Sequence, residues 1–348
     1  MEETLTTVAS VATRSCANCG QPAMDGDHPT PLCGDCRERL TRLHIPVWIW
    51  IFAGCIAVLL LFSLFTLPRS ISLGMHLERG KRALKEKKFN TAENEFSKVL
   101  EKVPSNIEAR GNLLIASFYN QDLEVFLAQV KKLDDEAVSD EDNTLYGEIE
   151  KVMLKAEGYF SNDTFEVFKK AYPDETHIPD TAWDRYLKTH TDDRNAVFAY
   201  ASLLYDRKNY HGCDSLLDLA LQIDYEYIPA LMLGVNSKRD QGDLNGAMTY
   251  VDRILAINPE SVWGLSAKAR TLLRQKKIKP GLDLALKLYD MNKQSVYAMS
   301  TLILAYHFNG RTDERDALIK KAQSAASDSL GKDNLQYALD VINNKEKF

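Results

Sequence analysis

The sequence lacks the short motifs that commonly mark an enzyme active site. It contains no phosphate-binding P-loop, no dinucleotide-binding glycine fingerprint, no nucleophile elbow and no HExxH motif. Its 7 histidines show no spacing that suggests a metal site of their own. We therefore expect a protein that binds other molecules and is not an enzyme.

Long runs of basic residues are also missing. The 348-residue chain has 43 Lys and Arg residues against 49 Asp and Glu residues, a formal net charge of -6. No basic run is long enough to follow a nucleic-acid backbone. Nucleic acid is therefore not an expected partner.

Cysteine is scarce and unevenly placed, because four of the 6 cysteines stand before residue 40, which excludes a disulfide scaffold for the whole chain. These four form two C-x2-C hooks that are separated by thirteen residues: Cys16, Cys19, Cys33 and Cys36. Each hook presents two thiolates to one metal ion, and four thiolates make a closed tetrahedral zinc site with no position for a substrate. Redox-active or disulfide-bonded cysteines, or an iron site, are the alternatives.

The motifs CANCG and LCGDC resemble those of zinc-ribbon and treble-clef modules. The resemblance implies a structural zinc ribbon over residues 16–44, with Zn2+ as its cofactor. The polar and small residues before it, 1–15, are predicted to form a flexible tail.

Charge is absent from Val47 to Leu67, a run of 21 residues. At 1.5 Å per residue, a helix of this length spans roughly 31 Å, about the thickness of the hydrocarbon core of a bilayer. Trp48 and Trp50 stand near one end, and indole rings favour the headgroup layer. We therefore predict one transmembrane helix over residues 46–67, with the membrane as a partner.

Two arguments about the orientation of this helix disagree. Reduced thiolates at a zinc site favour a cytoplasmic N-terminal side. The basic residues that follow the run, from Arg69 to Lys87, favour the opposite orientation. Because large domains translocate largely regardless of charge, we predict a cytoplasmic zinc ribbon and an extracytoplasmic C-terminal domain.

Strand-like alternation is absent after Pro68, and a helical pattern recurs there with a period of 34 residues. Most of the eighth and twentieth positions are small in blocks that begin at Arg194, Ile228, Val262 and Val296, although Val235, Ile303 and Arg315 depart from this pattern. Gly242 and Gly310 share the fifteenth position, at the turn between two helices. The segments KRALKEKKFNTAENEFSKVLEKVP and DQGDLNGAMTYVDRILAINP resemble the tetratricopeptide repeat (TPR).

The resemblance implies an all-α fold, a TPR-like solenoid of helical hairpins preceded by the zinc ribbon and one transmembrane helix. TPR-like hairpins are expected at residues 68–140 and TPR-like repeats at 194–348, where the last helix is a capping helix. Between them, over residues 141–193, the 34-residue register is lost, so irregular helices are expected.

In TPR proteins the first helix of each hairpin lines a groove, and the resemblance places seven residues of this chain there: Tyr205, Asn236, Arg239, Trp263, Arg270, Arg274 and Tyr297. Aromatic anchors combined with three arginines suit an extended peptide that carries negative charge. Solvated side chains without a ligand are the alternative. We expect these arginines to be exposed, so that replacing Arg270 and Arg274 leaves stability unchanged.

Two functions agree with these features. The first is a membrane-anchored scaffold whose superhelix binds a protein or peptide partner. The second is a regulatory accessory subunit of a membrane-associated enzyme or transport complex, with the zinc ribbon as a nucleic-acid or redox-sensing module. The acidic balance and the few basic residues near the cysteines weigh against nucleic acid.

Overall fold

The structure, a computed structural model, describes residues 15–22, 29–41, 46–134, 143–174, 177–327, 329–346 and 348, without the side chains of 62–70, 134, 143, 329 and 330. The tail predicted at residues 1–15 therefore lies outside the described part except for Ser15. The chain divides into two compact units, Met1–Ser70 and Ile71–Phe348.

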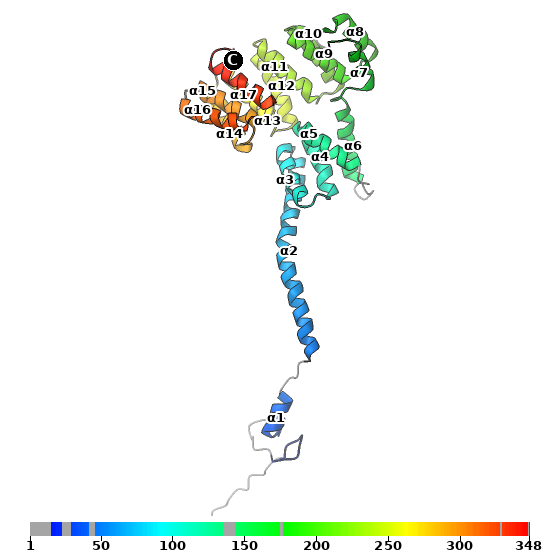
Figure 1. Cartoon of the computed structure of the whole chain (residues 1–348), viewed down its shortest axis with the longest axis vertical. Helices are drawn as coiled ribbons and strands as arrows, with labels where there is room; N and C mark the ends of the chain where they lie inside the picture. The colour runs from blue at the N-terminus through cyan, green and yellow to red at the C-terminus, as the bar shows by residue number, and fades with distance from the viewer. Residues whose placement is uncertain are drawn as a thin grey trace, which may run out of the picture. The chain divides into compact units, whose positions relative to one another are not determined.

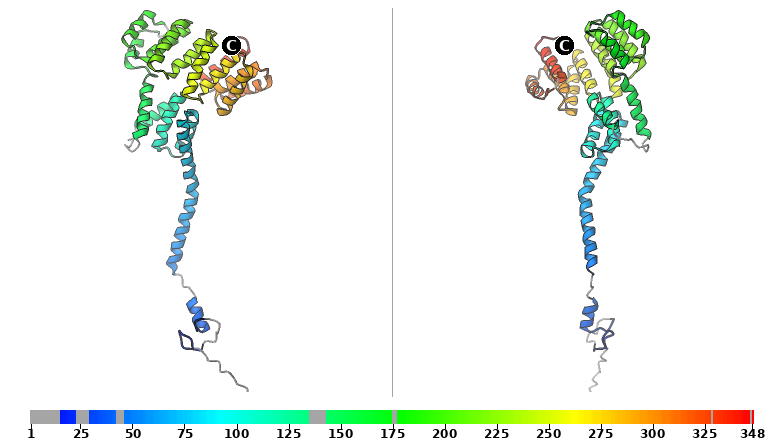
Figure 2. Two further views of the ribbon diagram at one scale, coloured as in Figure 1. Left: turned by 180° about the vertical axis from the view of Figure 1, so that it is seen from behind. Right: turned by 45° about the vertical axis from the view of Figure 1, so that its right-hand side comes forward.

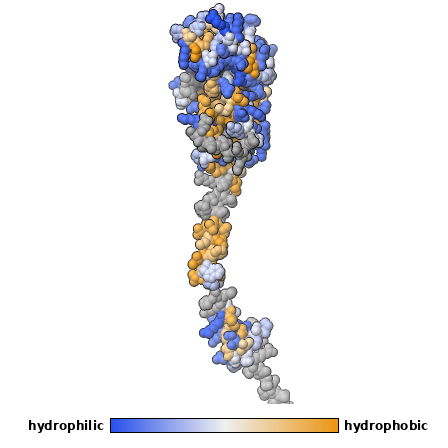
Figure 3. Space-filling model, turned by 90° about the vertical axis from the view of Figure 1, so that its right-hand side faces the viewer, coloured by the Kyte–Doolittle hydropathy of each residue, from blue (hydrophilic) through white to orange (hydrophobic). Residues whose placement is uncertain are grey.

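The first unit contains α1 (Gly34–Thr41) and the first part of α2 (Val47–Lys85) (Figure 1). Over residues 47–61 of α2, large apolar side chains such as Trp48, Trp50 and Leu59 are about two-thirds exposed, and this surface is hydrophobic in Figure 3. Among the described residues, no helix is both long enough and apolar enough to span a membrane. The crossing predicted over residues 46–67 is not supported there, and its side chains at 62–67 lie outside the described part.

The second unit is built of helices, which Figures 1 and 2 show as successive antiparallel pairs. After the end of α2 these are α3 (Phe89–Lys102), α4 (Ile107–Asn120), α5 (Leu123–Asp134), α6 (Asn143–Glu157), α7 (Asp163–Lys170), α8 (Asp180–Thr189), α9 (Arg194–Asp206), α10 (Tyr210–Ile223), α11 (Ile228–Asp240), α12 (Leu244–Ile257), α13 (Val262–Arg274), α14 (Ile278–Met291), α15 (Val296–Phe308), α16 (Thr312–Ala325) and α17 (Ser329–Ile342). The predicted all-α fold of TPR-like hairpins is confirmed.

The 34-residue pattern has a direct structural meaning, because the four blocks begin at the first residues of α9, α11, α13 and α15. Ala201 and Ala269, at the eighth position, and Cys213 and Ala247, at the twentieth, are completely buried. Small side chains at these positions let the two helices of a hairpin approach each other closely. Each hairpin therefore contacts its neighbour, as α13 contacts α14 and then α15.

The turn inside each hairpin imposes one special backbone conformation. Gly242 and Gly310 have φ angles of 82° and 69°, in the left-handed region that favours glycine. The fifteenth position of the other two blocks carries Lys208 and Lys276, with φ angles of 58° and 61°, and the turns after α2 and α4 carry Lys87 and Gln121, with φ angles of 56° and 64°. The turn therefore keeps the same backbone conformation in hairpins that have no glycine at this position.

The irregular segment predicted around residues 141–193 contains α6, α7 and α8, and an aromatic cluster joins α7 to α8. Phe165, Trp183 and Tyr186 are buried in it, with ring centroids of Phe165 lying 5.8 Å from Trp183 and 5.7 Å from Tyr186. Aromatic packing therefore stabilises these short helices in place of the small-residue positions of the regular hairpins.

The first hairpins also contact a much later turn of the same unit. The backbone N–H and the hydroxyl of Thr91, in α3, each donate to the Glu260 carboxylate at 2.9 Å. The Asn258 amide donates to Asn120 Oδ1 at 3.2 Å. The turn between α12 and α13 is thus tied to the hairpins formed by α3, α4 and α5, although 169 residues separate Thr91 from Glu260.

Candidate functional site

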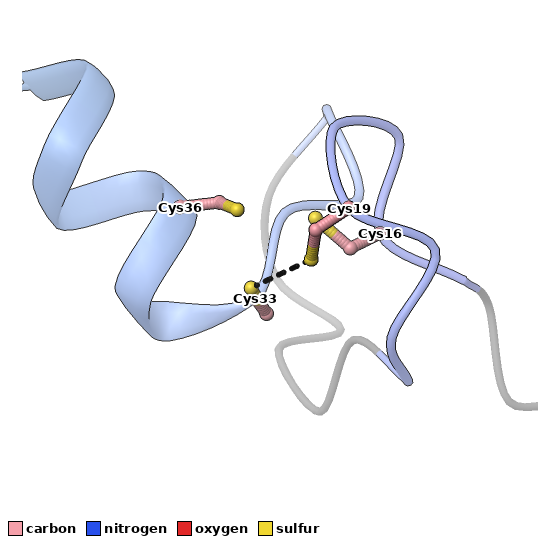
Figure 4. Close-up of side chains that lie close together, drawn as sticks. All are labelled: Cys16, Cys19, Cys33 and Cys36. Carbon is pink, nitrogen blue, oxygen red and sulfur yellow. Dashed lines mark hydrogen bonds between the residues drawn. The ribbon is translucent and has the colours of Figure 1, made fainter.

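The four predicted zinc ligands lie together (Figure 4), with their sulfur atoms all within 4.8 Å of one another. Cys19 Sγ is 3.5 Å from Cys33 Sγ. The first hook is a turn in which the Gly20 N–H donates to the Cys16 carbonyl, and Gly20 has a φ angle of 77° that glycine adopts without strain. The second hook runs into α1, which carries Cys36.

This donor set fits a tetrahedral metal site. Zinc–sulfur bonds of about 2.3 Å place tetrahedral ligands about 3.8 Å apart, close to the separations here. Backbone hydrogen bonds from Cys33 and Asn18 lower the pKa of Cys16 to about 6, which favours its thiolate, whereas hydrogen bonds among the cysteine side chains leave the pKa values of Cys19 and Cys33 raised. The Asn18 amide also donates to Cys36 Sγ at 3.3 Å. Hydrogen bonds of this kind orient the ligands of metal sites.

The residues predicted to line the groove lie on the first helices of successive hairpins. Tyr205 is on α9, Asn236 and Arg239 are on α11, and Tyr297 is on α15. Six of the seven make contacts in three separate sets: Tyr205 and Arg274 both approach Asp240, Arg239 bonds to Asn236, and Arg270 lies over the ring of Tyr297. Trp263, in the first turn of α13, instead packs half-buried against the apolar core.

We call Arg239, Arg270 and Arg274 the arginine cluster. Arg270 is only 4% exposed, which contradicts the expectation that it is an exposed groove residue. Its Nε donates to Thr301 Oγ1 at 3.0 Å and its Nη2 to Ser300 Oγ at 2.9 Å, and both hydroxyls come from α15. The guanidinium also lies 4.9 Å from the ring centroid of Tyr297. Its partners are therefore neutral.

The other two arginines make few charged contacts. Arg274 Nη1 is 3.8 Å from Asp240 Oδ1, at the outer limit for an ion pair. Arg239 donates to Asn236 Oδ1 at 2.8 Å, whereas its buried Nε has no hydrogen-bond partner among the described residues. Burial lowers the pKa of Arg274, and the positive charge of Arg239 lowers it further.

Tyr205 connects this region to the preceding hairpin. Its hydroxyl donates to Asp240 Oδ2 at 2.5 Å, so Tyr205 and Arg274 share the Asp240 carboxylate. Burial, followed by the neighbouring Asp240, raises the pKa of Tyr205 above its usual range, and the tyrosine therefore remains a neutral donor at physiological pH.

Four contributors were not predicted from the sequence: Asp240, Ser300, Thr301 and Tyr337. Ser300 occupies the fifth position of its block, a groove position in TPR proteins, so the repeat register could have indicated it. Tyr337 belongs to α17, which packs mainly on α15, and its ring lies 5.7 Å from the Arg270 guanidinium. Nothing in the 34-residue pattern places a capping helix there.

No family model matches the chain, and no curated protein matches it. Solved structures that resemble it include a tetratricopeptide repeat protein from Parabacteroides merdae, with 13% identity over 79% of this chain and 86% of that chain and a TM-score of 0.42. Yeast Tom70 has 14% identity over 73% of this chain and 60% of its own, with a TM-score of 0.39. Pseudomonas aeruginosa pilF has 13% identity over 78% and 99%, with a TM-score of 0.35. These likenesses concern the fold and assign no function.

Proposed function

We propose that the hairpin unit binds a protein or peptide partner through the first helices α9, α11, α13 and α15, and that the chain is a membrane-anchored scaffold. The observation that carries the proposal is the arginine cluster, because the described residues compensate its charges only in part. Burying charged groups without ionic partners is costly, and such groups are common where a ligand supplies the opposite charge.

Zinc at the four cysteines has a structural role in this proposal. A metal ion with four thiolate ligands has no open position for a substrate, so it would stabilise the fold around α1. Membrane anchoring rests on the uncharged run from Val47 to Leu67 and on the exposed apolar side chains of its first part.

A pull-down with purified full-length chain as bait tests partner binding, with the double variant Arg239→Gln/Arg274→Gln as the comparison. A protein that the wild type captures and the double variant loses supports the proposal. Capture that does not differ between the two would place the binding surface elsewhere.

Fractionation and protease protection test the anchoring. We expect the chain to remain in membranes washed at alkaline pH. We also expect added protease, after permeabilisation of any outer membrane, to release the hairpin unit and to leave residues 15–41 protected. Recovery of the chain in the alkaline wash would contradict anchoring, and digestion of the cysteine segment alone would reverse the orientation.

A further inference from the structure

Two turns of the later hairpins reach back to earlier helices of the same unit. The turn between α10 and α11 contacts the end of α6, where the Tyr227 hydroxyl donates to the Gly158 carbonyl at 2.9 Å. The turn between α12 and α13 contacts α3, where Thr91 donates to Glu260. Glu260 follows Glu226 by 34 residues, so the two turns stand in the same register of the repeat. The early helices therefore meet the later hairpins at two separate contacts.

The first contact is buried and aromatic. Tyr227 is only 1% exposed, and its ring lies 5.2 Å from that of Tyr159 in an edge-to-face arrangement. Lys155 of α6 adds an ion pair with Glu226, at 2.5 Å. Separating the two rings would expose large apolar surfaces to water, so we expect this contact to persist while the hairpins are folded. We call the contact between Tyr159 and Tyr227 the pivot.

The second contact consists of hydrogen bonds close to the surface. Thr91 is exposed, and its backbone N–H and hydroxyl both donate to the Glu260 carboxylate at 2.9 Å. The Asn258 amide donates to Asn120 Oδ1 at 3.2 Å, and the Asn120 amide donates in turn to Glu93 at 2.8 Å. Bonds to water can replace such bonds, so each adds little net stability. We call the hydrogen bonds from Asn258 and Glu260 to α3 and α4 the clasp.

Glu260 acts as a cap for a helix in another hairpin. Thr91 is the third residue of α3, and the first N–H groups of a helix have no partner within that helix. Lys88, which precedes α3, has no acceptor atom in its side chain. The Glu260 carboxylate therefore satisfies the start of α3 and lies at the positive end of its dipole. Water can take its place without unfolding α3.

We infer that the clasp opens and closes about the pivot while the hairpins themselves stay folded. In the closed form, Asn258 and Glu260 hold α3 and α4 beside the start of α13. In the open form, α3 and α4 move away together with α6, on which α4 packs, and water replaces the partners of Thr91 and Asn120. A molecule that binds one form more tightly than the other shifts the balance between them.

Hydrogen exchange of the purified full-length chain tests the inference at Thr91. In wild type, the Thr91 N–H should exchange faster than the Val99 N–H inside α3, at a rate that low denaturant does not change, because opening exposes little surface. Glu260→Ala should raise the Thr91 rate by about tenfold and leave the Val99 rate within about twofold. Glu260→Gln keeps an acceptor oxygen but loses the charge, so its rate should be intermediate.

Spin-label distances distinguish opening of the clasp from loss of a helix cap. Labels attached to azide-bearing residues in place of Glu101, in α3, and Lys279, in α14, spare the native cysteines, and both positions are exposed. The otherwise unchanged chain should give mainly one distance. Glu260→Ala should add a second, longer distance, because α3 then leaves the turn between α12 and α13.

Glu226→Ala is the matched control. It removes the same charged group from the corresponding position of the preceding turn, but leaves the buried Tyr227 hydroxyl bonded to the Gly158 carbonyl. The exchange rate of Thr91 should stay within about twofold of wild type, and the spin-label distance should not change. Circular dichroism should show equal helix content in all variants.

Two results would overturn the inference. A Thr91 N–H that exchanges in wild type only at the rate of global unfolding would show that the clasp does not open by itself. A single, unchanged spin-label distance in Glu260→Ala, even with faster exchange at Thr91, would show that Glu260 only caps α3. Faster exchange together with the longer distance, in Glu260→Ala and not in Glu226→Ala, supports the clasp.

Discussion

The cysteine segment and the hairpin unit bury different kinds of side chains. In the described residues 15–22 and 29–41, the buried side chains are Cys16 and Cys36, both candidate metal ligands. In the hairpins, apolar and small residues such as Leu217 and Ala247 are completely buried. Apolar packing therefore holds the hairpins together, whereas the buried side chains described in the first region are ones that could bind a metal ion.

Removing a bound metal ion should produce the largest difference in stability between the cysteine segment and the hairpin unit. Chelation, or Cys16→Ser, should abolish ordered structure in residues 15–22 and 29–41, because a segment with so few buried apolar groups cannot fold without its metal. Hydrogen exchange should rise to the unfolded rate there and stay unchanged in the hairpins. Cys55→Ser, outside the site, should retain one zinc per chain. A protected, metal-free segment with two disulfides would refute the zinc assignment.

Substitutions of Arg270 test whether this buried charged side chain contributes to the packing of the hairpin core. Arg270→Ala should destabilise the hairpin unit by about 3 kcal/mol, because it leaves a cavity between α13 and α15. Arg270→Met fills a similar volume without a charge, so its stability should lie within about 1 kcal/mol of wild type. Chemical denaturation measures both. Equal stability of wild type and both variants would indicate that Arg270 is an exposed groove residue, as the sequence predicted.

Glu93 should make the stability of the hairpins depend on pH. Burial, together with the nearby Asp122, raises the pKa of Glu93 to about 7, although the Asn120 amide donates to its carboxylate at 2.8 Å. The folded state therefore binds a proton more tightly than the unfolded state, and stability falls as pH rises from the usual glutamate pKa to about 7. The loss should be on the order of 1 kcal/mol after allowance for partial solvent access.

Melting temperatures measured across this pH range would test the effect, and Glu93→Gln should flatten the profile. A Glu93→Gln protein with the same pH profile as wild type would show that other groups determine it.

The smallest expected effect is a gain in stability at the hairpin turns. Lys276 has a φ angle of 61°, a conformation that costs a lysine more than a glycine. Lys276→Gly should therefore stabilise the unit by about 0.5 kcal/mol, after the entropy cost of glycine is subtracted. Lys287→Gly, at an exposed position in the middle of α14, should destabilise it by about 1 kcal/mol, and calorimetry would compare the two. A loss of stability in both variants would contradict the turn argument.

The repeat register could be predicted because it follows from local spacing. Block starts coincide with the first residues of α9, α11, α13 and α15, since helix length and turn length are encoded within each block. The burial of Arg270 could not be predicted in this way. A groove position specifies which face of a helix a residue occupies, whereas the exposure of Arg270 also depends on Ser300, Thr301 and Tyr337 from later helices.

The contact between Thr91 and Glu260 has a consequence for how the chain is made. A ribosome adds roughly 5 to 20 residues per second, and 169 residues separate these two partners. The first hairpins therefore leave the ribosome roughly 10 to 30 s before the turn that binds them exists. During that interval the polar groups of Thr91 and Asn120 lack their later partners and are exposed to solvent. A chaperone that binds the growing chain would therefore have more time to bind at this surface.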